Sequence, residues 1–341
     1  MDFPNSLAEF QKCFPDAQAC RAYLEAVKWP EGFVCASCQH QGEPYRFETR
    51  SACVLRCRAC KVNASLTAGT VMHASHTPLP TWFWGAYLMT THPPGMSALQ
   101  FQRQLGLSRY ETAYQILHKL RAGMVRPGRD QIGGEYPVEV DETLVGGATV
   151  GEGHGVHHKA IVVAAVEVRK RKDGEDMAAD GNEQHRDGKP VKRKTYAGRL
   201  RLTVVPDRSG DELCGFVERN VLPGTLVRTD GWEAYTRLEN GGYSHSPLVM
   251  AGKDKGGKGK RNDEHLPIVH LVFSNLKAWL AGTHHGVSPQ HLQAYLNEFT
   301  FRFNRRFYPM VAFNSVLGIA SHVTPPTYDA LYSGAWTHRS A

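Results

Sequence analysis

The chain of 341 residues contains no long hydrophobic run, and this absence limits what the protein can be. No segment approaches the roughly 18 consecutive apolar residues that a membrane-spanning helix needs. The first residues, 1–5, contain neither a basic segment nor an apolar one, so we expect no secretory signal peptide. The sequence therefore predicts a cytoplasmic protein with no membrane partner.

A strong charge bias and a high cysteine content are also missing. The formal net charge of +7 is compatible with a polyanionic partner, but such a charge is also common in proteins that never bind nucleic acid. Eight cysteines in a chain of this kind favour metal binding or free thiols over a disulfide framework. The length suits two or three domains with a sizeable core.

Two Cys-x-x-Cys motifs stand out after a predicted pair of short helices in residues 1–30. The first is Cys35 with Cys38 and the second is Cys57 with Cys60, and 18 residues separate them. This spacing is typical of a zinc ribbon, in which four thiolates bind Zn²⁺ tetrahedrally. Because no coordination position stays open, the predicted zinc is structural. Residues 45–47 and 54–56 are expected to form the hairpin strands, and Cys13, Cys20 and Cys53 are expected only to pack.

A helix, a short turn and a second helix are predicted between residues 97 and 122. Ser97 is the expected N-cap of the first helix, the turn contains Gly106, and Tyr110 begins the second helix. This outline resembles a helix-turn-helix, although many helical hairpins bind nothing. The neighbouring zinc ribbon and the basic chain favour DNA binding. The residues predicted to contact DNA here are Arg103, Arg109, Lys119 and Arg121.

Two carboxylates, Asp141 and Asp230, end predicted strands in the second half. Val138 and Val140 alternate with Glu139 and Asp141, which is the period of a strand with one apolar and one acidic face. Each Asp alone is most simply a surface acid, but two together are able to hold a hard divalent cation. The predicted strands are 137–145, 159–168, 199–205 and 225–229, with helices after Ser209 and at 232–238, and with a polar insertion at about 169–194.

Basic residues gather in two later segments, and each set has two interpretations. Residues 252–261 form either a solvated loop or a loop that grips phosphates. The end of a predicted helix starting at Pro289 carries arginines that suit either the helix dipole or DNA phosphates. The residues concerned are Lys253, Lys255, Lys258, Lys260, Arg261, Arg302, Arg305 and Arg306.

Another predicted helix runs from Pro267 to Gly282. Ile268, Val269, Val272, Leu276 and Leu280 form its buried stripe. His270 and Lys277 share the opposite side, because seven residues are close to two helical turns.

The strand and helix order is that of an RNase H-like core, and the chain resembles bacterial DDE-type transposases of the insertion sequence 1595 family. The matching motifs are VEVDETLVGG (138–147), TDGW (229–232), VHLVFSNLK (269–277), GTHHGVSP (282–289) and FTFRFNRR (299–306). The resemblance implies an α/β fold with a mixed sheet flanked by helices. The expected division is helices and zinc ribbon in 1–75, a helix-turn-helix-like region in 76–128, a catalytic domain in 129–325 and a tail in 326–341.

The same resemblance implies metal-dependent DNA cleavage at insertion-sequence ends and strand transfer into target DNA. It assigns two Mg²⁺ or Mn²⁺ ions to Asp141, Asp230 and His270, with Asp141 bridging both, and it gives Lys277 a DNA contact. The nearby acids Glu139 and Glu142 are expected to be structural. Many relatives have Asn or Glu where this chain has His270, which matches a subgroup with Asp, Asp, His and Lys. Because His adds no negative charge and is a softer ligand, Mg²⁺ affinity depends on whether His270 binds the ion or only packs.

The partners implied are terminal inverted repeats and target DNA, bound by a homodimer or higher oligomer in the bacterial nucleoid. Two other functions fit the same residues. One is an RNase H-like nuclease or resolvase that cuts without joining. The other is a catalytically inactive DNA-binding regulator derived from a transposase, which only the departure at His270 favours.

Overall fold

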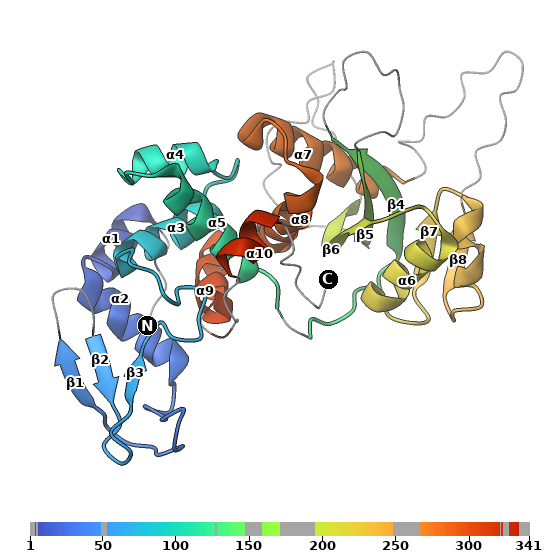
Figure 1. Cartoon of the computed structure of the whole chain (residues 1–341). Helices are drawn as coiled ribbons and strands as arrows, with labels where there is room; N and C mark the ends of the chain where they lie inside the picture. Colours follow the sequence, from blue (N-terminus) through green and yellow to red (C-terminus); the bar gives the residue numbers. More distant parts are fainter. Residues whose placement is uncertain are drawn as a thin grey trace, which may run out of the picture. The chain divides into compact units, whose positions relative to one another are not determined.

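The computed structural model describes residue 4 and residues 6–48, 53–126, 128–146, 159–170, 195–247, 266–320, 322 and 327–333. The chain divides into two units, one formed by residues 1–128 with 281–341 and the other by residues 129–280 (Figure 1). This division differs from the expected one. Residues 281–325, expected in the catalytic domain, belong to the first unit, and 1–75 and 76–128 form part of that same unit.

The first unit is mainly helical. Side chains of Ser6, Asp16 and Ser97 each accept a backbone N–H three residues later, so these polar residues set where three of its helices begin. Its helices are α1 (Leu7–Cys13), α2 (Ala17–Lys28), α3 (Leu79–Thr91), α4 (Ala98–Gln104), α5 (Tyr110–Ala122), α8 (Pro289–Asn304), α9 (Pro309–Ala320) and α10 (Tyr328–Ser333).

An aromatic core joins helices that are distant in sequence. The ring of Phe10 on α1 lies 4.3 Å from that of Tyr87 on α3 and 5.6 Å from that of Phe313 on α9, centroid to centroid. Gly123 follows α5 at a point where an added Cβ would lie 2.9 Å from the Cβ of Ala320. The first and last parts of the chain therefore share one core, and α9 and α10 are helices that the sequence reading missed.

The expected helix–turn–helix outline is present as α4 and α5. Gly106 has a φ of +61°, the left-handed conformation that glycine adopts at little cost, and it ends α4. The N–H of Leu107 then donates to the carbonyl of Gln102 at 3.0 Å, which closes the turn.

The zinc-ribbon region contains a three-stranded antiparallel sheet in the order β1-β2-β3. Its strands are β1 (Tyr45–Glu48), β2 (Cys53–Arg56) and β3 (Asn63–Ser65). The two hairpin strands predicted from sequence are confirmed, and β3 is additional. Cys20 is buried and Cys53 packs against the ribbon core as expected, whereas Cys13 is exposed, so packing was the wrong prediction for that residue.

The second unit is built on a five-stranded mixed sheet in the order β6-β5-β4-β7-β8. Strand β4 pairs antiparallel with β5 and parallel with β7, and β5 pairs antiparallel with β6. This confirms the expected mixed α/β sheet. The strands are β4 (Val138–Val145), β5 (Ala160–Lys170), β6 (Thr195–Val205), β7 (Leu226–Thr229) and β8 (Ser244–Pro247), of which β8 was not predicted.

Side-chain alternation on β4 separates an apolar face from an acidic one. Val138 and Val140 belong to a core that includes Phe216 of α6 (Gly210–Asn220) and Tyr235 of the 3₁₀ helix η1 (Glu233–Leu238). Glu139 and Asp141 point to the opposite face, where both contact α7 (Pro267–His284). Two of the candidate ligands, Asp141 and His270, therefore lie between β4 and α7.

Two expectations about this region need comment. Helix α7 does not end at Gly282 but continues to His284, and the chain leaves it through His285 and Gly286, which both have positive φ. The predicted insertion falls mostly on residues 171–194, which lie outside the described residues. None of the helices in the described ranges is long and apolar enough to cross a membrane.

Candidate active site and metal sites

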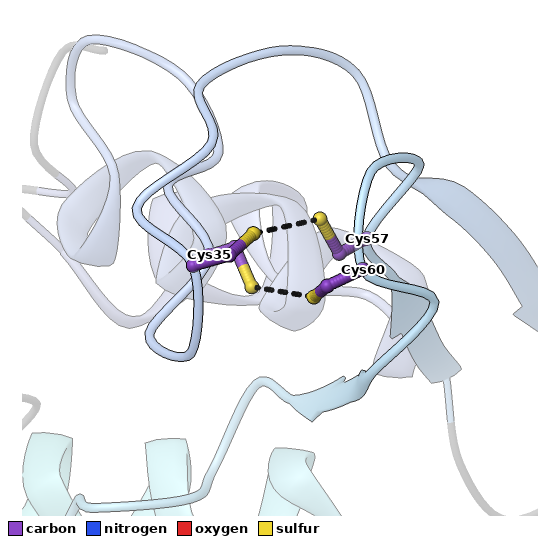
Figure 2. Close-up of side chains that lie close together, drawn as sticks. Cys35, Cys57 and Cys60 are labelled. Atoms are coloured by element: carbon purple, nitrogen blue, oxygen red, sulfur yellow. Dashed lines mark hydrogen bonds between the residues drawn. The ribbon is translucent and has the colours of Figure 1, made fainter.

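The four cysteines of the two Cys-x-x-Cys motifs converge at one point of the ribbon. The Sγ atoms of Cys35 and Cys60 lie 3.6 Å apart, as do those of Cys38 and Cys57, and all four lie within 4.8 Å of one another (Figure 2). A tetrahedron with zinc–sulfur bonds of about 2.3 Å has edges of about 3.8 Å. The donor set and its dimensions therefore fit one structural zinc ion.

Each cysteine pair is held by the same backbone turn. The N–H of Gln39 donates to the carbonyl of Cys35 at 2.9 Å, and the N–H of Lys61 donates to the carbonyl of Cys57 at 3.1 Å. Gln39 and Lys61 also share positive φ values of 58° and 61°. Backbone N–H groups in the first turn, that of Cys38 foremost, lower the pKa of the Cys35 thiol to about 7, which favours the thiolate that binds metal.

In the second unit, Asp141 and His270 are brought into direct contact. Their Oδ2 and Nε2 atoms lie 2.9 Å apart, although 129 residues separate them in the sequence. Both side chains remain partly accessible, with exposed fractions of 13% and 22%. Two neighbouring ligands of one octahedral Mg²⁺ lie about 3 Å apart, since each bond is about 2.1 Å. The pair thus fits two ligand positions of a shared cation.

Glu139 fixes the helix that carries His270. Its Oε2 accepts the backbone N–H groups of Ile268 and Val269, each at 2.9 Å, and the residue is almost completely buried. These N–H groups belong to the first turn of α7, which has no acceptor of its own there. A carboxylate also suits the positive end of the helix dipole. The sequence reading left Glu139 as structural, and its contacts define that role.

Asp230 follows β7 directly. Strand β7 runs parallel to β4, with Val138 opposite Val227 and Glu139 opposite Arg228, so Asp141 and Asp230 both follow this paired segment on its C-terminal side. Asp230 Oδ1 accepts the N–H of Trp232 at 3.0 Å. Among the described residues, the four cysteines are the one group of three or more potential metal ligands whose ligand atoms lie close together. The carboxylate of Asp230 is therefore farther from Asp141 and His270 than the ligands of one ion would be.

Glu142 is a further acid beside these two. It accepts the Tyr235 hydroxyl at 2.9 Å and lies 3.4 Å from the guanidinium of Arg208. Burial raises its pKa most, the Tyr235 hydrogen bond and the charge of Arg208 lower it, and the charges of Asp141 and Asp230 raise it. Glu142 is predicted from sequence to be structural, because its contact with Tyr235 joins residues 93 positions apart and leaves no local pattern in the sequence.

The predicted DNA-contacting residues fall into three groups. Lys277 is exposed on α7, Arg103 and Arg109 are exposed on and beside the α4–α5 hairpin, and Lys119 is partly buried. Three arginines at the end of α8 donate to backbone carbonyls: Arg302 to that of His92, Arg305 to that of Phe301 and Arg306 to that of Phe303. These contacts are compatible with a structural role at the helix end as well as with DNA binding. The lysines at 253, 255, 258 and 260 and the arginine at 261 lie outside the described residues.

Arg121 is a correction to the DNA-binding prediction. Its side chain is only 2% exposed, its Nε donates to Glu298 Oε2 at 2.8 Å, and its guanidinium lies 4.0 Å from the ring centre of Tyr295. A group enclosed in this way cannot reach a DNA phosphate. The burial of Arg121 could not be predicted from the sequence, because Arg121 lies at the basic end of an amphipathic helix and its partner Glu298 is 177 residues away.

Comparison with protein families gives two matches. Residues 131–304 match the ISXO2-like transposase domain, and residues 15–63 match the transposase zinc-ribbon domain. The first match covers the sheet, α7 and α8, and the second covers the four cysteines. No curated protein and no solved structure matches the chain.

Proposed function

Because the chain belongs to the insertion sequence 1595 family of transposases, we propose that it cuts DNA at the ends of its element and joins them to target DNA. The family supports a transposase function in general. The observation that carries the finer proposal is the contact between Asp141 and His270, which pairs a strand-end carboxylate with a helix-borne imidazole. Both residues are predicted from sequence motifs, and their proximity supports a common ligand role.

The proposed reaction is an in-line displacement at phosphorus. Asp141, Asp230 and His270 would hold Mg²⁺ or Mn²⁺, which would activate the attacking oxygen and stabilise the leaving oxygen. Water first displaces a DNA 3′ oxygen, which leaves as a free 3′-OH. That 3′-OH then attacks a phosphate of the target, where the new ester bond replaces the bond to the target's own 3′ oxygen, and this oxygen leaves as a 3′-OH. The two carboxylates supply the negative charge of the site, and Glu139 keeps His270 in position through α7.

Lys277 is proposed to hold a DNA phosphate beside the site. It lies two turns after His270 on α7 and is exposed. An ammonium group on a flexible stem acts as a point charge for a phosphate. Arg103 and Arg109 of the α4–α5 hairpin are proposed to bind the transposon end, and the ribbon cysteines are proposed to bind one structural Zn²⁺.

The test uses the full-length protein with duplexes from both ends of the insertion sequence. Asp141→Asn and Asp230→Asn should each lower cleavage and strand transfer by about a thousandfold or more, while end binding stays near that of the wild type. Glu218→Gln, which neutralises an exposed acid of the same unit, is the matched control and should remain active. Cleavage without joining would identify a nuclease or resolvase. Binding with neither reaction would identify a regulator.

A further inference from the structure

The ribbon sheet has one covered face and one open face. On the covered face, both terminal nitrogens of Arg46 donate to the carboxylate of Glu25 on α2, at 2.8 and 2.6 Å. Leu55 on the same face is buried in the ribbon core with Phe33. Since neighbouring residues of a strand point to opposite sides, Tyr45, Phe47 and Arg56 occupy the other face.

The open face combines exposed aromatic rings with cations. Tyr45 and Phe47 are 42% and 46% exposed. The guanidinium of Arg56 lies 5.0 Å from the ring centre of Phe47, and the guanidinium of Arg58 lies 4.9 Å from that of Tyr45. Lys61 Nζ lies 5.0 Å from the Tyr45 ring. These five residues, Tyr45, Phe47, Arg56, Arg58 and Lys61, are named the open ribbon face.

Among the residues that the structure describes, the cations of the open ribbon face contact rings and one amide. Arg56 Nε donates to the amide oxygen of Asn63 at 2.7 Å, and the other side-chain contacts are those with the rings of Phe47 and Tyr45. Of the five residues of the open ribbon face, three are cations and none is an acid. A ring face orients a cation but leaves its charge able to act on an outside anion. Such preorganised positive charge complements a polyanion, because less side-chain freedom is lost on binding.

We propose that the open ribbon face binds the phosphate backbone of duplex DNA, as a contact separate from the α4–α5 hairpin. The proposal rests on the transposase function proposed above for its choice of polyanion. In this arrangement, zinc bound by both Cys-x-x-Cys motifs would fix the second motif, which carries Arg58 and is followed directly by Lys61, next to the end of β2. The rings of Tyr45 and Phe47 keep the cations extended from the sheet. The ribbon then contributes binding energy directly as well as a stable fold.

The experiment measures binding of the full-length chain, without added Mg²⁺, to a mixed-sequence duplex of about 40 base pairs over a range of salt concentrations. Arg58→Gln removes one cation of the open ribbon face. Lys12→Gln removes one exposed cation from α1 of the same unit and is the matched control. Zinc content and thermal unfolding of both variants confirm that the ribbon remains folded.

We expect Arg58→Gln to weaken duplex binding about three- to tenfold at low salt and to reduce the salt slope by about one. Phe47→Ala should weaken binding similarly, because Arg56 loses the ring that orients it. Lys12→Gln should leave both quantities unchanged. Equal behaviour of Arg58→Gln and Lys12→Gln would overturn the proposal. A loss seen only with a single-stranded probe of the same length would overturn the duplex assignment.

Cleavage and strand transfer by the wild type in Mg²⁺ are measured separately. If the wild type is inactive while Arg58→Gln still weakens binding, the transposase proposal fails and the open ribbon face stands. If the wild type is active and Arg58→Gln binds normally, the proposal for the open ribbon face fails and the transposase proposal stands.

Discussion

The carboxylate of Glu139 accepts the backbone N–H of Val269 at 2.9 Å, so strand β4 directly holds the first turn of helix α7. His270 is the residue after Val269, and Asp141 lies two residues after Glu139. Each partner of the proposed ligand pair is therefore within two residues of one end of a buried hydrogen bond. This relationship makes the position of His270 depend on an acid that is not one of the proposed metal ligands.

Replacing Glu139 by Leu should loosen this part of the site. The N–H groups of Ile268 and Val269 would lose their acceptor in a buried place, which costs about 2 to 4 kcal/mol of unfolding free energy. The half-saturating Mg²⁺ concentration for cleavage should also rise. Glu139→Gln keeps an acceptor oxygen and should recover most of both quantities. Urea unfolding and Mg²⁺ titration check this, and an unchanged Mg²⁺ requirement in Glu139→Leu would rule out the positioning role.

His270→Ala tests whether His270 binds metal. Removing a ligand should raise the half-saturating Mg²⁺ concentration about tenfold or more, and Mn²⁺ should rescue cleavage better than Mg²⁺ because it accepts nitrogen ligands more readily. His270→Glu should keep or improve the response to Mg²⁺. Asn275→Ala, on an exposed part of the same helix, is the control. Full activity of His270→Ala at the wild-type Mg²⁺ concentration would mean that His270 only packs against Asp141.

The ribbon cysteines are expected to bind one zinc ion per chain. Cys38→Ser and Cys60→Ser should each lose most of it and expose the ribbon to protease, since metal binding and folding of so small a sheet are one process. Cys13→Ser changes an exposed cysteine outside the cluster and should retain the full amount. Metal analysis of the purified variants decides this. Equimolar zinc in Cys38→Ser would show that the cluster is not the zinc site.

The buried pair of Arg121 and Glu298 should matter for stability and not for DNA. Glu298→Gln leaves a buried guanidinium without its counter-ion and should cost about 3 to 5 kcal/mol. The double variant Arg121→Met with Glu298→Leu should recover much of that loss, because both charges of the pair are removed. The part that is not recovered reflects Arg302, whose guanidinium lies 3.4 Å from Glu298 in the wild type. Its affinity for duplex DNA should equal that of the wild type. Weaker DNA binding by a fully folded double variant would show that Arg121 contributes to DNA binding.

Glu167 should make the second unit sensitive to acid. Burial raises its pKa, but the N–H groups of Arg199 and Gly133 and the guanidinium groups of Arg169 and Arg199 outweigh this effect, so the pKa is lower than usual. The folded state thus favours the ionised form, and this stability is complete above the unfolded pKa near 4.5. This contribution to stability is lost as the pH falls from the unfolded pKa through the lower pKa that Glu167 has in the folded state.

The variant Glu167→Gln lacks this titration. At neutral pH it should be less stable than the wild type by about 3 kcal/mol, because Arg169 loses its carboxylate partner and Arg199 keeps only the exposed Asp130. The difference between the two proteins should shrink as the pH falls below about 4. Urea unfolding from about pH 7 to about pH 3 measures it. A difference that stays constant over this range would exclude Glu167 as the titrating group.

Some features of this protein follow from the sequence because they are local. The spacing of the two Cys-x-x-Cys motifs gives the knuckles, Ser97 and Gly106 give the limits of α4, and the alternation of Val138, Glu139 and Val140 gives β4 and its two faces. In each of these cases, the residues that determine the structure lie within a few positions of one another. Family motifs add Asp141, Asp230 and His270 as candidate ligands.

Tertiary structure alone decided the rest. Glu139 receives the N–H groups of α7 from 129 and 130 residues away, and Arg121 finds Glu298 at a separation of 177. A charged side chain has the same sequence signature on a solvated helix face as in a buried pair, so only the packing of α5 against α8 distinguishes the two. The open ribbon face has the same origin. Tyr45 and Phe47 alternate with Arg46 in any conformation of β1, but α2 covers one side and leaves the other exposed.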